Sequence, residues 1–206
     1  MNQKIIKNTL ILTAITLISG LLLGFVYEIT KEPIAASREN RKQEAYHTVF
    51  QEAETFQTFE AFEEKEAEEI LRNAGVSGCY VNEAALALDS GENAIGSVVT
   101  ATSKEGYGGE IKVSVGITLD GTVTGIELLS ISETAGLGMN AQEPEFKEQF
   151  QDVNTDHFEV VKGDDGKEGK INALSGATIT TDAVTNAVNA AVDYYHGAME
   201  GGSVNE

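Results

Sequence analysis

The longest hydrophobic pattern in the chain is an uninterrupted apolar stretch near the N-terminus. The nineteen residues 9–27, TLILTAITLISGLLLGFVY, carry no charge. As an α-helix they would extend about 28 Å, at about 1.5 Å per residue, which is close to the thickness of the hydrocarbon core of a bilayer. A cleavable signal peptide is the alternative, but its apolar region is usually shorter and ends at small residues, and no such site closely follows Tyr27. The pattern therefore predicts a transmembrane helix.

The charges around this stretch predict its orientation. Lys4 and Lys7 precede it, and cytoplasmic flanks of membrane helices are enriched in such cations. We therefore expect a single-pass protein of the cell membrane (inner or plasma membrane), with a cytoplasmic N-terminus and an extracytoplasmic main domain.

One face of the predicted membrane helix carries small residues at three- and four-residue spacings, namely Thr9, Thr13, Thr16, Gly20 and Gly24. Small residues let helices in lipid approach closely, which favours packing against a partner protein in the membrane. The alternative is that Gly and Thr are simply common in membrane helices. Both interpretations stay open at this stage.

A helical pattern continues beyond Pro33. In the segment 34–50, apolar residues recur at helical spacing, at Ala45, Tyr46, Val49 and Phe50. We also expect helices or helix fragments in the acidic segment 51–72, with the glutamates on a solvated face. Residues 31–75 are thus predicted to form an acidic, helical, membrane-proximal segment.

Alternating apolar residues predict a β-hairpin in the middle of the chain. The apolar side of its first strand is formed by Ile111, Val113, Val115, Ile117 and Leu119. Asp120-Gly121 supplies a two-residue turn, after which residues 123–129 return as the second strand.

Apolar residues near the C-terminus recur every three or four positions, at Val184, Ala187, Val188, Ala191, Val192 and Tyr195. This spacing predicts an amphipathic helix that begins around 180–182 and ends at His196-Gly197. Together the elements predict an α+β domain, an antiparallel sheet with packed helices, preceded by one transmembrane helix. We expect boundaries at 1–30 for the N-terminus and membrane helix, 76–198 for the main domain and 199–206 for a flexible tail.

The composition excludes several functions. With 14 Lys and Arg against 33 Asp and Glu, the net charge of −19 argues against nucleic-acid binding, which needs a basic face. The single cysteine, Cys79, excludes a four-cysteine zinc site and a cysteine-ligated iron–sulfur cluster within the chain. The run from Asp152 to Asp156 begins like a calcium loop but has His157 and Gly163 where Gly and Glu are needed. We therefore expect no metal site, and any redox chemistry needs an organic cofactor.

Three glycine-containing segments are the remaining candidates for chemistry. They are Gly106-Tyr107-Gly108-Gly109, Glu133-Thr134-Ala135-Gly136-Leu137-Gly138 and Ser175-Gly176-Ala177-Thr178-Ile179-Thr180, with Thr181 directly after the last. The third precedes the predicted C-terminal helix, where free backbone amides and the helix dipole attract phosphate. Ordinary helix capping by Ser or Thr explains the same residues equally well.

At these segments the sequence resembles the FMN-binding domain family, and within it the G subunits of Rnf-type electron transport complexes. The similarity extends from about Ala101 to His196, and the single membrane helix agrees with it. The family motif Asp-x-x-Ser/Thr-Gly-Ala-Thr here reads 172–178, NALSGAT. The C subunits of sodium-translocating NADH:quinone reductases are close relatives and provide one alternative. A non-redox, membrane-anchored binding domain provides another.

The resemblance implies covalent FMN, attached through a phosphoester to the last threonine of the motif, Thr178. A threonine hydroxyl is a poor nucleophile without a base, so a separate flavin transferase is the expected partner for maturation. The other cofactor-binding residues implied are Tyr107, Gly108, Gly109, Glu133, Thr134, Gly136, Leu137, Gly138, Ser175, Gly176, Ala177, Thr180 and Thr181.

Two positions depart from the family pattern. Asn172 stands where Asp is usual, which would lower the efficiency of flavin attachment if the transferase reads the charge. Ala135 stands where Pro is usual, which should only loosen the loop. We expect the chain to transfer electrons within a membrane complex that couples this transfer to Na⁺ or H⁺ translocation. It acts with other subunits of that translocase, without independent catalytic activity and without a catalytic acid or base.

Overall fold

The structure, a computed structural model, describes residues 3–163 and 167–200. Contacts divide the chain into two compact units, Met1–Lys42 and Gln43–Glu206. The second unit holds the sheet and every helix after α1, so it contains all three glycine segments.

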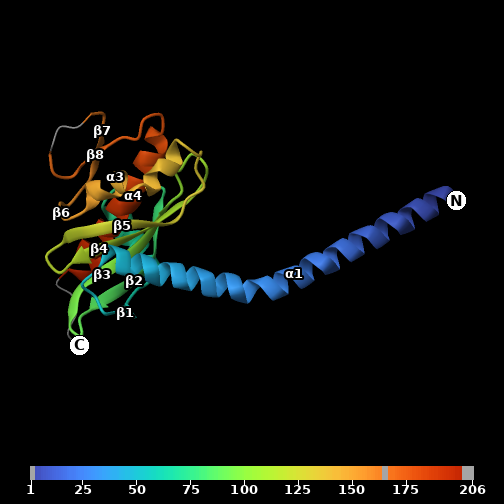
Figure 1. Cartoon of the computed structure of the whole chain (residues 1–206), viewed down its shortest axis with the longest axis horizontal. Helices are drawn as coiled ribbons and strands as arrows, with labels where there is room; N and C mark the ends of the chain where they lie inside the picture. Colours follow the sequence, from blue (N-terminus) through green and yellow to red (C-terminus); the bar gives the residue numbers. More distant parts are fainter. Residues whose placement is uncertain (1–2, 164–166, 201–206) are drawn as a thin grey trace. The chain divides into compact units, whose positions relative to one another are not determined.

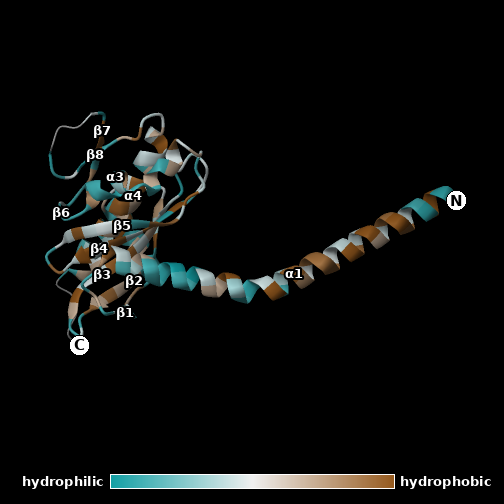
Figure 2. Ribbon diagram, in the orientation of Figure 1, coloured by the Kyte–Doolittle hydropathy of each residue, from teal (hydrophilic) through white to brown (hydrophobic). Residues whose placement is uncertain are grey.

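The first helix, α1 (Gln3–Val49), is one continuous helix that includes Pro33. Its apolar part contains the predicted span, and no residue of its most apolar eighteen-residue window is buried. Figure 2 shows the helix brown toward its N-terminal end and teal where the chain becomes hydrophilic. The chain thus has an N-terminal helix that is long and apolar enough to span a membrane, as predicted.

The main sheet has six strands in the order β1-β2-β3-β4-β5-β6, all paired antiparallel (Figure 1). Its strands are β1 (Thr55–Thr58), β2 (Cys79–Leu88), β3 (Ala94–Ser103), β4 (Ile111–Thr118), β5 (Thr122–Ser130) and β6 (Val153–Asn154). The predicted α+β class with an antiparallel sheet is confirmed. A separate pair, β7 (Glu159–Val161) and β8 (Lys170–Asn172), is parallel.

The predicted hairpin is formed by β4 and β5, with a connection of three residues instead of two. Gly121 closes the turn at φ +84, a conformation that favours glycine, and its N–H donates to Thr118 O at 3.0 Å. The apolar residues of β4 are fully buried, whereas Leu119 lies in the turn and is exposed.

The two faces of the sheet pack against different helices. The core face of β3 and β4 contacts α4 (Thr178–Tyr194), and α2 (Glu64–Asn73) lies against β2 and α4. On the other face, Val98 packs against Tyr46 and Val49 at the end of α1 and against Phe50, the residue after the helix. β3 is therefore buried on both faces. The buried hydroxyls of Thr100 and Ser114 on this face hydrogen-bond to each other at 3.0 Å, which pairs these polar groups.

Three short helices lie between β5 and β6 along the chain, and the last two are α3 (Pro144–Lys147) and η2 (Glu148–Phe150). Phe146 and Phe150 of these helices are buried in the core beside Phe158. They close the end of the core that lies next to β5.

Three local predictions were wrong in detail. Residues 55–58, expected to be helical, form β1 because they pair with β2, whereas α2 is a helix as expected. The C-terminal helix begins at Thr178, and a π-helical turn, η3 (Tyr195–Met199), carries the chain past His196. Met199, assigned to the tail, is buried, and the rest of that predicted tail from 201 lies outside the described residues.

Candidate functional site

The fold brings the three glycine segments together beside the N-terminus of α4. The Gly108 N–H donates to Glu133 Oε1 at 3.0 Å, which joins the first segment to the second. A Cβ added to Gly138 would lie 2.5 Å from Thr180 Oγ1, and one added to Gly176 would lie 3.2 Å from Leu137 Cδ2. These contacts join the second segment to the third, so one site contains all three.

The second segment is a compact loop that runs into η1 (Gly138–Gln142). The Thr134 carbonyl accepts hydrogen bonds from the backbone N–H groups of Leu137 and Met139, at 3.1 and 3.2 Å. Gly136 has φ +75, which favours glycine, while Ala135 is exposed where the family pattern has Pro. Hydrogen bonds within the loop therefore hold its shape without the proline.

The N-terminus of α4 has free backbone donors. Its N-cap, Ala177, makes no side-chain capping bond, and the N–H of Thr181 is the first to bond back, to Ala177 O at 3.0 Å. The amides of Thr178, Ile179 and Thr180 have no acceptor among the described residues. Capping by Ser or Thr, one of the two interpretations left open by the sequence, is therefore absent in this part of the structure. The free amides favour an anion.

The four hydroxyl side chains at this helix end divide into two pairs. Thr178 and Ser175 are exposed, whereas Thr180 and Thr181 are buried. The Thr181 hydroxyl donates to Ala177 O and accepts from Leu174 N, both at 3.0 Å, so its role is structural. Thr178 makes no side-chain hydrogen bond with any described residue, so no described base is hydrogen-bonded to its hydroxyl to activate it.

Each glycine segment also presents one exposed apolar side chain. Tyr107 is 73% exposed, Leu137 42% and Ile179 53%. Exposed side chains of this size, brought together by two loops and the first turn of α4, are typical of a binding surface. The alternation of polar and apolar residues gave no signal for this surface, because its side chains come from three segments that are separate in the sequence.

A cleft of about 480 Å³ borders the site between α4 and β7. It is lined by Ile179, Asp182 and Thr185 of α4, by residues 157–160, and by Glu105 after β3. Sequence reasoning missed this cleft because β7 is short and pairs only with β8.

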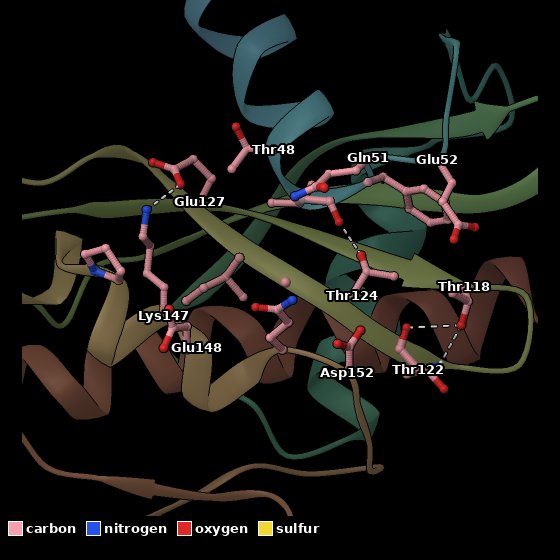
Figure 3. A pocket seen from close by; sticks show the side chains of 16 residues that line it. Thr48, Gln51, Glu52, Thr118, Thr122, Thr124, Glu127, Lys147, Glu148 and Asp152 are labelled. Atoms are coloured by element: carbon pink, nitrogen blue, oxygen red, sulfur yellow. Dashed lines mark hydrogen bonds and ion pairs between the residues drawn. The ribbon is translucent and has the colours of Figure 1, made fainter.

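A second groove, of about 460 Å³, lies between the end of α1 and the outer face of β5 (Figure 3). Some of its polar groups are paired with one another, since Lys147 Nζ lies 2.7 Å from Glu127 Oε2 and the Thr124 hydroxyl donates to Val49 O. None of its lining residues belongs to the glycine segments. This groove lies between the end of α1 and the sheet and is separate from the site.

Burial makes the single cysteine a poor nucleophile. Cys79 is partly buried at the start of β2, and this burial raises the pKa of its thiol, with a smaller contribution from the Glu105 carboxylate. The thiolate is the reactive form, so Cys79 is unsuited to redox or nucleophilic chemistry at neutral pH.

Two family models match separate parts of this chain. The FMN-binding domain family matches residues 106–193, which include all three glycine segments, and the RnfG N-terminal region matches residues 1–49. The G subunit of the proton-translocating ferredoxin:NAD(+) oxidoreductase complex of Clostridium ljungdahlii is 36% identical over 182 residues, covering 88% of this chain and 86% of that protein.

Two further similarities involve a curated protein and a solved structure. The G subunit of the Na(+)-translocating ferredoxin:NAD(+) oxidoreductase complex of Acetobacterium woodii is 32% identical, covering 94% of this chain and 92% of that protein. The crystal structure of NqrC from Shewanella oneidensis has a TM-score of 0.48 and 21% identity, covering 56% of this chain and 58% of that chain.

Proposed function

This chain belongs to the family of G subunits of ion-translocating oxidoreductase complexes, and from that membership we propose that it is a membrane-anchored, FMN-bearing electron-transfer protein of such a complex. The observation that carries the proposal is the single site formed by the three glycine segments, all of which lie within the matched FMN-binding domain. When bound, FMN supplies the ability to accept and donate one or two electrons.

The residues of the site fit such a group. The free amides of Thr178, Ile179 and Thr180 are suited to a phosphate, since the positive end of the α4 dipole lies there as well. Tyr107, Leu137 and Ile179 offer apolar contacts suited to an aromatic ring system. The chain itself therefore binds and orients the cofactor, and none of its groups is required to act as an acid or base.

We assign covalent attachment to the Thr178 hydroxyl. Thr180 is 2% exposed and Thr181 is fully buried and hydrogen-bonded, which disfavours both as attachment points in the folded chain. Ser175 is exposed but precedes the helix, whereas Thr178 is its first residue. Since no described group activates Thr178, a separate flavin transferase is the expected source of the base. Asn172, the departure from the motif, lies at the end of β8, where its N–H donates to Gln149 Oε1 at 2.7 Å.

The remaining parts of the proposal concern the membrane. The apolar part of α1 anchors the chain, with Lys4 and Lys7 on the cytoplasmic side and the sheet domain outside. The other subunits of the complex are its partners in the membrane.

Mass spectrometry of the flavin-bearing peptide tests the attachment. We expect flavin on Thr178 in the wild type and complete loss in Thr178→Ala, whereas the flavin that Ser175→Ala carries should still be on Thr178. Thr178 is exposed and makes no side-chain hydrogen bond with a described residue, so its replacement should change the unfolding free energy by less than about 0.5 kcal/mol. Covalent flavin on a well-folded Thr178→Ala protein would show that another residue carries it.

A further inference from the structure

The cleft between α4 and β7 lies on the same side of the helix as the proposed attachment residue. Thr178, Asp182 and Thr185 are separated by four and three positions, which places them on one face of α4. Asp182 and Thr185 line the cleft. A protein that reaches the Thr178 hydroxyl from solvent therefore also meets the cleft.

The cleft is lined by three carboxylates, those of Glu105, Glu159 and Asp182, against one side chain that can become a cation, His157. Asp182 and Glu105 form no ion pair with a described residue, although Glu105 Oε2 accepts a hydrogen bond from Asn186 Nδ2 at 3.0 Å. Glu159, the third carboxylate, is paired with Lys170. These carboxylates disfavour a phosphate or another anion in the cleft and favour a cation.

An unpaired hydroxyl gives an independent indication of a missing ligand. Thr185 lines the cleft and is only 1% exposed, and its Oγ1 has no hydrogen-bond partner among the described residues. Buried polar groups are nearly always paired, because burying them unpaired is unfavourable. The Thr185 oxygen can accept a hydrogen bond from a donor that enters the cleft.

The lining favours an organic cation over a metal ion. Across residues 3–163 and 167–200, no group of three or more His, Cys, Asp or Glu side chains is arranged to hold a metal. Phe158, Val160 and Ile179 provide apolar walls that suit the hydrocarbon stem of a long side chain. An arginine combines such a stem with a planar group of several N–H donors, which can serve carboxylates and a hydroxyl together.

We propose that this cleft receives a basic side chain, an arginine by its chemistry, from the enzyme that attaches the flavin to Thr178. The inference rests on the proposed function, because that enzyme must bring its own base and flavin phosphate to the exposed Thr178 hydroxyl. In the transfer, that base takes the proton of the Thr178 hydroxyl, the threonine oxygen bonds to the flavin phosphorus, and the diphosphate bond of the flavin dinucleotide substrate breaks, so that the other nucleotide leaves as its monophosphate. The enzyme must therefore contact this face of α4. The cleft would then orient the enzyme through complementary charge.

The rate of flavin attachment to the purified full-length protein in detergent, with the purified transferase and its flavin nucleotide substrate, tests the proposal. The double variant Glu105→Gln/Asp182→Asn should react at least tenfold more slowly than the wild type at low salt. Its rate should also depend less on ionic strength, because screening has less charge to act on. Thr185→Val, which removes the hydroxyl and keeps the shape, should slow the reaction several-fold.

The matched control is Glu64→Gln/Glu68→Gln on α2, which makes the same charge change outside the cleft. It should react within twofold of the wild type, and unchanged thermal unfolding of every variant shows that each one folds. If Thr178 is labelled and the cleft variant reacts as fast as the control, the cleft inference is wrong while the proposed attachment stands. A cleft variant that is labelled normally but fails to join the complex likewise overturns it, because the occupant is then another protein of the complex. Labelling of Thr178→Ala overturns the proposed attachment itself.

Discussion

At the residue scale, the site depends on positions where backbone segments approach too closely for a side chain. A Cβ on Gly108 would lie 2.0 Å from the backbone oxygen of Ser132, and one on Gly106 would lie 2.3 Å from the backbone oxygen of Gly109. Neither obstacle is the flexible end of a side chain, so the backbone itself must shift to accept a substitution. Because Gly108 has no side chain, the first and second segments can lie in contact.

Gly108→Ala is therefore expected to lower the unfolding free energy by about 1–3 kcal/mol, as overpacked positions do, and to reduce flavin content. Gly125→Ala in β5 is the control, because its added Cβ meets nothing within 4 Å. We expect that control to be neutral or slightly stabilising. Urea unfolding and flavin absorbance measure both effects, and equal stability of the two variants would contradict the close approach.

Two adjacent tyrosines at the end of α4 offer a second test at this scale. The Tyr194 hydroxyl is buried without a partner among the described residues, and burial raises its pKa to about 12. The Tyr195 hydroxyl donates to Leu119 O at 3.0 Å. Tyr194→Phe should leave the unfolding free energy unchanged or raise it by about 1 kcal/mol, while Tyr195→Phe should lower it by about 1 kcal/mol. Chemical denaturation of both variants checks the opposite signs. A loss of stability in Tyr194→Phe would reveal a partner for that hydroxyl.

At the element scale, α1 serves two different environments. Its N-terminal part is apolar and exposed, whereas Tyr46 and Val49 near its end are buried in the sheet domain. The threonines at positions 9 and 16 satisfy their hydroxyls by bonding to carbonyls one turn back, as Thr9 does to Ile5 O at 2.9 Å. Because these hydroxyls bond within their own helix, this face carries only small side chains, which another helix can approach closely.

Replacing Gly20 and Gly24 by Leu tests whether this face packs against another protein of the complex. Leucine favours the bilayer, so the helix should still insert, but its bulk blocks close approach of another helix. We expect the yield of intact complex to fall several-fold on affinity purification while the amount of this chain in the membrane is unchanged. The same change at Thr48, beyond the apolar span, controls for altered expression. Normal recovery of the complex would show that the face is only lipid-exposed.

At the scale of the whole molecule, an acidic domain follows a helix that is long and apolar enough to span a membrane. The chain carries a net charge of −19, while both charges that precede the apolar stretch are positive. This distribution suits a domain that remains in aqueous solution outside the membrane, joined to it by a single helix.

Cysteine labelling in intact cells measures this topology. A cysteine in place of Glu68, exposed on α2, should react with a membrane-impermeant maleimide in a Cys79→Ala background. Wild-type Cys79 gives a separate measurement. Burial raises the pKa of its thiol, so the thiol is mostly protonated near pH 7. After lysis, its reaction with maleimide should become faster as the pH rises above 9. Labelling of the introduced cysteine only after lysis would reverse the proposed orientation.

The sequence by itself determined the features that depend on neighbouring residues. The β4–β5 hairpin and the apolar face of α4 follow from periodicity, because burial of one face requires that spacing. The apolar span follows from an uncharged run that is long enough to cross a bilayer. The resemblance at residues 172–178 indicated FMN as the cofactor, which periodicity and charge could not identify.

Only the tertiary structure decided how distant segments meet. Residues 55–58 become a strand because they pair with β2, which lies far along the chain and which a local pattern cannot reveal. Likewise, the resemblance pointed to Thr178 among the four hydroxyls near the start of α4, but only packing buries Thr180 and Thr181 and leaves Thr178 exposed. The cleft beside Thr178 exists because Glu105 and β7 reach α4 from far along the chain. Long-range contacts of this kind follow from the packing of the whole domain, and no local spacing encodes them.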